Sequence, residues 1–187
     1  MTVSKSHVSR PTLYLVGFPA SGKTTAGKWL HKSDNRLWFD LDREIETTAG
    51  LSIPQIFDRF GESHFRKLEA ESLKNNFLQN AIISTGGGTP LFHGNMEFML
   101  SSGIVIYLKL PVEDLIARLM KSKTKRPLFE NLTQEQMQEK IQEMYRFRDP
   151  VYSKAHIHFS AKNLKSGNIN SLKSLIDNYL KKNNRET

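Results

Sequence analysis

The sequence contains no cysteine among its 187 residues. This absence excludes disulfide frameworks, thiolate zinc sites, iron–sulfur clusters and cysteine nucleophiles. No stretch reaches the roughly 18 consecutive apolar residues that a membrane span requires. The first ten residues are polar and lack the apolar run of a signal peptide. We therefore expect a soluble, cytoplasmic protein with no membrane partner.

Acidic residues are scarce relative to basic ones, since 27 Lys and Arg stand against 19 Asp and Glu, a net charge of +8. Such an excess favours anionic partners such as phosphates, carboxylates or nucleic acid, although it serves solubility equally well. No aromatic residues are interleaved with the positive charge as platforms for stacked bases. We therefore expect no nucleic-acid partner.

A chain of this length fits one domain with a substantial core. Short apolar runs alternate with segments of helical periodicity, which predicts an α/β fold with a parallel sheet. We expect a polar leader over 1–11, one domain over 12–180 and a basic tail over 181–187. The expected strands are 13–16, 37–39, 81–83, 104–108 and 157–159, and the expected helices are 22–30, 53–77, a segment around 96, 112–121, 133–145 and 169–180.

Residues 17–24 match the phosphate-loop pattern G-x-x-x-x-G-K-[ST], between an expected strand and an expected helix. Gly17 and Gly22 permit backbone angles and a close approach that a Cβ would obstruct. The loop amides and the helix N-terminus would bind phosphate oxygens, and Lys23 would add a positive charge. The hydroxyl of Thr24 would bind Mg²⁺. The pattern predicts ATP or GTP binding but does not identify the molecule that would accept a phosphoryl group.

Candidate acceptor residues follow the second and third expected strands, where ligands bind in open α/β sheets. One of Asp40 and Asp42 could support Mg²⁺ while the other accepts a proton from a substrate hydroxyl. The alternative is that Asp42 caps the following helix. Three glycines at 86–88 would either expose backbone amides to a ligand or form a flexible loop.

Arg66 and Arg148 are candidate residues on or just after expected helices. Arg66 and Glu69 share a helix face, and a guanidinium binds a carboxylate through two parallel hydrogen bonds. The alternative for Arg66 is a surface pair with Glu62 or Glu69. Arg148 lies at a helix C-terminus, where it could instead complement the helix dipole.

Residues 121–131 are rich in positive charge and contain an Arg126-Pro127 break between two expected helices. They could form a lid that closes over the nucleotide and excludes water. Arg126 would then stabilise charge on the transferring phosphoryl group. The alternative is a solvated basic loop.

Taken together, these motifs resemble the shikimate kinase family. The resemblance implies a P-loop kinase with a five-stranded parallel sheet in the order 2-3-1-4-5 and a mobile lid. It implies a monomer that uses ATP with Mg²⁺ and phosphorylates the 3-hydroxyl of shikimate, a step of aromatic amino acid biosynthesis. The matching pieces occur in family order at 17–24, 40–42, 65–69, 86–88, 126–128 and 148–152.

The resemblance also implies residue roles. Thr24 would bind Mg²⁺ directly, Asp40 would support the ion through water, and Asp42 would orient or deprotonate the attacking hydroxyl. Catalysis would rest on Lys23, Asp42 and Arg126. The ATP site would comprise Gly17, Ala20, Ser21, Gly22, Lys23, Thr24, Thr25 and Arg126, and the shikimate site Asp42, Arg66, Glu69, Gly87, Gly88 and Arg148.

The chain departs from the family pattern at two positions near these residues. Ala20 stands where many members have a third glycine in the phosphate loop, and Thr89 stands where a small apolar residue is common. Two other functions remain open at this point. One is another small-metabolite kinase, such as a gluconate-type enzyme, and the other is a kinase-like binding module without catalysis.

Overall fold

The computed structural model describes residues 10–75, 79–121, 129, 132–162, 164 and 168–183. Its centre is a five-stranded parallel sheet in the order β2-β3-β1-β4-β5, as predicted. The chain crosses from one side of β1 to the other between β3 and β4, so a crevice for ligands is expected at the carboxyl ends of these strands. The strands are β1 Thr12–Val16, β2 Leu37–Asp40, β3 Ala81–Ser84, β4 Gly103–Lys109 and β5 Ile157–Ser160.

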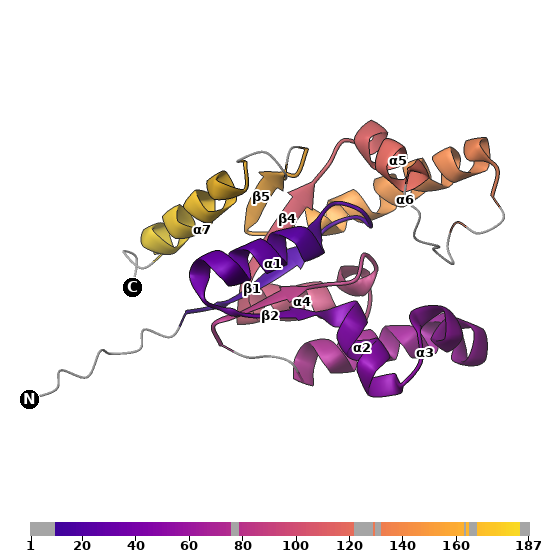
Figure 1. Ribbon diagram of the computed structural model, residues 1–187, viewed down its shortest axis with the longest axis horizontal. Coiled ribbons are helices and arrows are strands. Elements are labelled where there is room, and N and C mark those ends of the chain that lie inside the picture. Colours follow the sequence, from indigo (N-terminus) through magenta and orange to yellow (C-terminus); the bar gives the residue numbers. More distant parts are fainter. Residues whose placement is uncertain are drawn as a thin grey trace, which may run out of the picture.

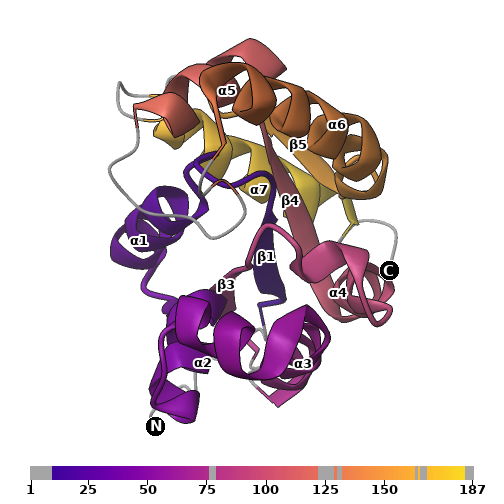
Figure 2. The same cartoon turned by 90° about the vertical axis from the view of Figure 1, so that its right-hand side faces the viewer.

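Helices cover both faces of this sheet. Figure 2 shows α1 and α4 on opposite sides of it. In Figures 1 and 2, α2 and α3 pack together at one end and α5 and α6 at the other. The helices are α1 Lys23–Asp34, α2 Leu41–Ala49, α3 Ile53–Asn75, α4 Asn95–Ser102, α5 Val112–Met120, α6 Gln134–Tyr152 and α7 Ile169–Asn183, with a 3₁₀ turn at Thr89–Leu91.

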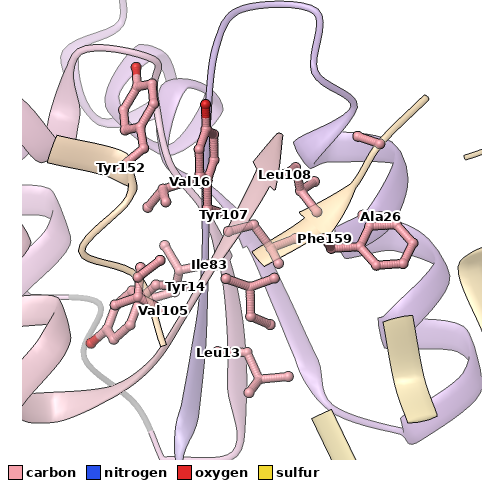
Figure 3. Packing of buried hydrophobic residues seen from close by; sticks show 14 of the residues in the cluster. Leu13, Tyr14, Val16, Ala26, Ile83, Val105, Tyr107, Leu108, Tyr152 and Phe159 are labelled. Carbon is pink, nitrogen blue, oxygen red and sulfur yellow. The ribbon is translucent and has the colours of Figure 1, made fainter. Parts of the chain in front are cut away.

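Burial of the central strands explains their continuous apolar runs. All five residues of β1 are buried, as are five of the seven in β4. A parallel strand between two helical layers has no solvent-facing side, so it carries no alternation of polar residues. Side chains of β1, β3 and β4 pack together with Ala26 of α1 and Tyr152 of α6 (Figure 3).

Several helices differ from the sequence-based expectations, and α1 and α6 run on to Asp34 and Tyr152, beyond the expected ends at 30 and 145. Helix α2 was not among the expected helices and entered only as the alternative in which Asp42 caps a following helix, because it has just two buried apolar residues, Leu41 and Ile45. Helix α7 continues to Asn183, which puts Lys181 and Lys182 in its last turn. Lysines there complement the negative end of the helix dipole, so the helix extends into the expected basic tail.

Local signals set the bounds and the bend of two other helices. Thr133 begins α6 with a capping box, in which its hydroxyl accepts from the Gln136 amide and the Gln136 side chain accepts from the Thr133 amide. Helix α3 bends at Gly61, whose φ of 79° and ψ of 171° are not helical. The bend separates a first segment from a second one that carries Arg66 and Glu69. Among the described residues, no helix combines the length and apolarity needed to span a membrane.

Candidate active site

The phosphate loop connects β1 to α1 and has the geometry that its glycines predict. Gly17 and Gly22 have φ values of 143° and 96°. A Cβ on Gly17 would lie 2.8 Å from the carbonyl oxygen of Leu108, so a larger residue would collide with β4. Lys23 folds back over the loop, and its Nζ donates to the carbonyl oxygens of Gly17 and Phe18 at 2.8 Å each. The ammonium group is thereby held at the mouth of the loop.

Ala20 occupies the left-handed region at φ 65°, where a Cβ costs about 1–2 kcal/mol. Its carbonyl oxygen accepts from Nη1 of Arg118 at 3.3 Å. Nη2 of Arg118 donates to the carbonyl oxygens of Ala161 and Lys162 at 3.0 and 2.8 Å. Arg118 therefore ties the phosphate loop to the segment after β5. Arg118 was not predicted as a site residue, because nothing in the pattern of α5 sets it apart from a surface arginine.

Thr24 and Asp40 present oxygen atoms side by side. The Thr24 hydroxyl in the first turn of α1 donates to Oδ2 of Asp40, at the end of β2, over 2.7 Å. A hydroxyl and a carboxylate suit a hard cation such as Mg²⁺. Within the described part of the chain, no three His, Cys, Asp or Glu residues form a metal cage. Mg²⁺ would therefore need phosphate oxygens and water as further ligands.

A cavity of about 410 Å³ brings the phosphate loop and the candidate acceptor residues together. It lies at the carboxyl ends of the strands, where the sheet order predicts a ligand crevice. Its lining is Pro19, Ala20, Gly22, Lys23, Thr24, Thr25, Asp40, Asp42, Thr85 and Gly87.

Asp42 is the second residue of α2, so it lies inside the helix and does not cap it. A Cβ placed on Gly86 would lie 2.7 Å from Oδ1 of Asp42 and 2.6 Å from Oε1 of Glu69. The two carboxylates thus face each other across one glycine. Burial and then the charge of Glu69 raise the pKa of Asp42 to about 6, although Lys23 opposes the shift. A carboxyl group with this pKa can exchange a proton near neutral pH.

Arg66 is 6% exposed and is held by two carboxylates of α3. Its Nη1 donates to Oε2 of Glu69 at 2.6 Å, and its Nε and Nη2 donate to Oε1 of Glu62 at 3.1 and 2.7 Å. Burial disfavours the charge of Arg66, but the two carboxylates outweigh it and raise the pKa. The alternative interpretation, an ion pair of Arg66 with Glu62 or Glu69, is thus present in the structure. The pair with Glu69 is buried rather than on the surface.

The glycine segment 86–88 lies against both arginines. A Cβ on Gly88 would lie 2.3 Å from Nη1 of Arg66, so the guanidinium fills the space that a side chain would need. On the neighbouring residue, the Gly87 carbonyl oxygen accepts from Nη1 of Arg148 at 3.2 Å and from the Tyr152 hydroxyl. Arg148 is 9% exposed, so it does not merely complement a helix end. Two buried guanidinium groups from α3 and α6 therefore converge on one loop.

Aromatic rings connect the phosphate loop to α6, the helix that carries Arg148. Phe18 stacks on Tyr145 with centroids 5.0 Å apart and meets Tyr152 edge-on at 5.1 Å. The contacts of Phe18 with Tyr145 and Tyr152 were not predicted, because they join residues more than a hundred positions apart. The phosphate loop and α6 consequently form one packed unit.

Most of the predicted site residues meet around this cavity or in the shell behind it. The phosphate-loop residues, Asp40, Asp42 and Gly87 line the cavity or its loop, while Glu69 and Gly88 stand behind it with the two arginines. Ser21 is fully buried and faces the Gly17 backbone. Arg126 and most of the predicted lid over 121–131 lie outside the described residues.

Comparisons of sequence and of structure with known proteins identify the same family. The shikimate kinase family model matches residues 19–181. A shikimate kinase of Parabacteroides distasonis is 40% identical over 153 residues, which cover 81% of this chain and 88% of that protein. The crystal structure of a Bacteroides thetaiotaomicron shikimate kinase has a TM-score of 0.84 and 31% identity, covering 89% of this chain and 98% of that one. An Acinetobacter baumannii shikimate kinase solved with shikimate has a TM-score of 0.78 and 34% identity, covering 90% and 94%. This chain belongs to the shikimate kinase family.

Proposed function

We propose that this protein transfers the γ-phosphoryl group of ATP to the 3-hydroxyl of shikimate and releases ADP and shikimate 3-phosphate. The observation that carries the proposal is the convergence of Arg66 and Arg148 on the glycine segment beside Asp42. Shikimate is a small hydroxylated carboxylate, so its recognition calls for guanidinium groups on one side and a carboxylate near the reacting hydroxyl. The related Acinetobacter protein was solved with shikimate bound.

On the donor side, the phosphate loop binds the nucleotide through its amides and Lys23. Lys23 is already held over the loop by the Gly17 and Phe18 carbonyl oxygens, so it needs little rearrangement to reach a phosphate. Thr24 and Asp40 would hold Mg²⁺, which neutralises phosphate charge when it is bound. Gly17, Ala20, Ser21, Gly22 and Thr25 complete the proposed ATP site.

On the acceptor side, Asp42 orients the attacking hydroxyl and accepts its proton. Arg66 and Arg148 bind the acceptor carboxylate. Glu69 orients the Arg66 guanidinium through a hydrogen bond of 2.6 Å. The amides of Gly87 and Gly88 complete the proposed site. Phosphoryl transfer depends mainly on alignment and charge neutralisation, and this arrangement supplies both.

The proposed lid spans about 121–131 and contributes Arg126 to the transferring phosphoryl group. We propose it from the basic composition and the family resemblance. Arg126→Ala is expected to lower kcat far more than it weakens ATP binding, because an arginine in this role acts mainly in the transition state.

A coupled assay of ADP formation tests the proposed function. ATP and Mg²⁺ are supplied with shikimate, with gluconate or with no acceptor. Turnover is expected only with shikimate and is expected to be lost in Lys23→Ala. A matched control is Lys67→Ala, which removes an exposed lysine of α3. If no acceptor accelerates ADP formation in the wild-type protein, the proposal is wrong.

A cytoplasmic location and a monomeric state stay predictions from the sequence. Analytical ultracentrifugation of the purified protein, with and without ATP and shikimate, would test the second of these. A single species of monomer mass is expected at every concentration used in the assay.

A further inference from the structure

Thr89 is a buried polar residue that the proposed mechanism does not use. It follows Gly88 directly and begins the 3₁₀ turn Thr89–Leu91. Its side chain is completely buried. The turn is held by two hydrogen bonds, from the Leu91 amide to the Gly88 carbonyl oxygen at 2.9 Å and from Nδ2 of Asn95 to the Thr89 carbonyl oxygen at 2.9 Å. The hydroxyl of Thr89 is thus presented from a fixed backbone.

That hydroxyl is bonded to a carboxylate of the proposed acceptor site. Oγ1 of Thr89 donates to Oε1 of Glu69 at 2.6 Å, while Oε2 of Glu69 accepts from Nη1 of Arg66 at 2.6 Å. Within the described part of the chain, these are the two side-chain donors that reach Glu69. The carboxylate is 1% exposed, so water is not at hand to replace either of them.

The surroundings of Glu69 make the hydroxyl more important than an ordinary neutral donor. Oε1 of Glu69 faces Oδ1 of Asp42 across Gly86. Without the Thr89 hydroxyl, Oε1 would be a buried acceptor without a partner beside another carboxylate, an arrangement that is both desolvated and repulsive. Rotation of Glu69 would relieve it, and the short bond from Glu69 to Arg66 would move the guanidinium as well.

We propose that Thr89 is a positioning residue for the acceptor site, whose hydroxyl fixes Glu69 and, through Glu69, the direction of the Arg66 guanidinium. The inference rests on the proposed function, because it takes Arg66 as a binding group for the acceptor carboxylate. It goes beyond that function because Thr89 touches neither the cavity nor the phosphate loop. Its effect is therefore confined to the acceptor side.

Steady-state kinetics of Thr89→Val and Thr89→Ser test this inference. Valine keeps the shape of threonine but has no donor, whereas serine keeps the donor. For Thr89→Val we expect the KM for shikimate to rise by about tenfold or more, as for loss of a hydrogen bond to a charged group. The KM for ATP is expected to stay within about twofold, because the phosphate loop makes no contact with Thr89 in this arrangement. Thr89→Ser is expected to restore most of the shikimate KM.

The matched control is Thr47→Val, the same substitution at an exposed threonine of α2. Its hydroxyl donates only to the carbonyl oxygen of Arg43 in its own helix, at 2.9 Å. Both KM values are expected to equal those of the wild type. If Thr89→Val does not fold, Thr89→Ala removes the same donor without the valine methyl groups and is measured in its place.

Two results would overturn the inference while the proposed function stands. One is an unchanged shikimate KM in the variant without the hydroxyl. The other is an equal rise of the shikimate KM in Thr89→Ser, because the hydroxyl would then not be what matters. A wild-type protein that does not phosphorylate shikimate would instead overturn the proposed function, and this inference with it.

Discussion

The two ends of the parallel sheet differ in how their charged side chains are arranged. At the amino end, Arg36 precedes β2 and is 1% exposed, yet it donates to Oδ2 of Asp34 at 3.0 Å and to the Pro11 carbonyl oxygen at 2.6 Å. Lys173 of α7 also donates to Asp34. At the carboxyl end, Asp42 and Glu69 face each other across Gly86. Opposite charges are paired at both ends, since Arg66 pairs with Glu69, but the carboxyl end also brings two carboxylates together.

The pKa directions express the same contrast. Burial disfavours the charge of Asp34, but the hydrogen bonds from Lys173 and Arg36 outweigh it and lower the pKa. Burial and the charge of Glu69 raise the pKa of Asp42 to about 6. At the amino end, pairing therefore favours the ionised form of Asp34, although burial lowers the pKa of Arg36. At the carboxyl end, burial and a neighbouring like charge disfavour the ionised form of Asp42, a cost that functional sites commonly carry.

Asp42→Asn is expected to have the largest effect and to separate activity from stability. Loss of the proton acceptor should lower kcat by about 10²–10⁴-fold while ATP binding persists. Because the folded protein holds the Asp42 proton more tightly than the unfolded chain, Asp42 lowers stability as the pH rises from the ordinary pKa of 3.8 to about 6, and the loss is complete above that pH. The variant should therefore be about 1–3 kcal/mol more stable than the wild type at pH 7.

Steady-state kinetics and urea unfolding at pH 4 and pH 7 check both effects of Asp42→Asn. The gain in stability is expected to disappear near pH 4, where Asp42 is protonated in the folded protein. Asp58→Asn removes an exposed carboxylate of α3 and serves as the control. A variant with near wild-type turnover would contradict the role of Asp42.

Asp34→Asn is expected to show the reverse at the amino end. It removes the charged partner of a buried arginine, which should destabilise the fold by about 3 kcal/mol and leave kcat unchanged. Because the pKa of Asp34 is lowered, its contribution is present above the ordinary value of 3.8 and is lost as the pH falls. Urea unfolding at pH 7 with parallel kinetics checks this. Equal stability of variant and wild type would show that the pair at this end adds nothing.

The pH profile of kcat/KM for shikimate should report the like charges directly. Below about pH 6 it should fall by about tenfold per pH unit, because the free enzyme must have Asp42 ionised. Glu69→Gln removes the facing charge, so its acid limb should move to lower pH. Initial rates at shikimate concentrations well below KM, from pH 5 to pH 8, measure both limbs. A limb that moves to higher pH would contradict the charge interaction.

Ala20→Gly should have the smallest effect. Glycine relieves the left-handed strain of about 1–2 kcal/mol but adds about 0.5–1 kcal/mol of unfolded-state entropy. A net stabilisation of about 1 kcal/mol or less follows, which thermal unfolding can resolve. Gly22→Ala is the opposite change, since a Cβ there would lie 2.4 Å from Cδ1 of Leu164 at φ 96°. Destabilisation by Ala20→Gly would show that the loop is not strained at this position.

Several features of the protein could be predicted because their signals are short in sequence. The phosphate loop is one contiguous motif, and its glycines, Lys23 and Thr24 lie within eight residues. The three central strands β1, β3 and β4 are predicted from continuous apolar runs, because both of their faces are covered. The capping box at Thr133 is equally local. Helix α2 was missed because it is short and has only two buried apolar residues, Leu41 and Ile45, which is a weak signal in a sequence.

The contacts around the proposed acceptor site could not be predicted in this way, because they depend on packing between segments that are distant in the sequence. Thr89 and Glu69 are 20 residues apart, Arg148 and Gly87 are 61 apart, and Arg118 and Ala20 are 98 apart. Residue types indicate that such groups can bind one another, but the partner of each is set by which helices pack beside the sheet and at what depth. The sequence motifs therefore specify the phosphate-binding chemistry. The family resemblance predicted that Asp42, Glu69 and the two arginines share one site, but the contacts among them and the support from Thr89 follow only from the folded arrangement, because no local rule relates residues brought together by the core.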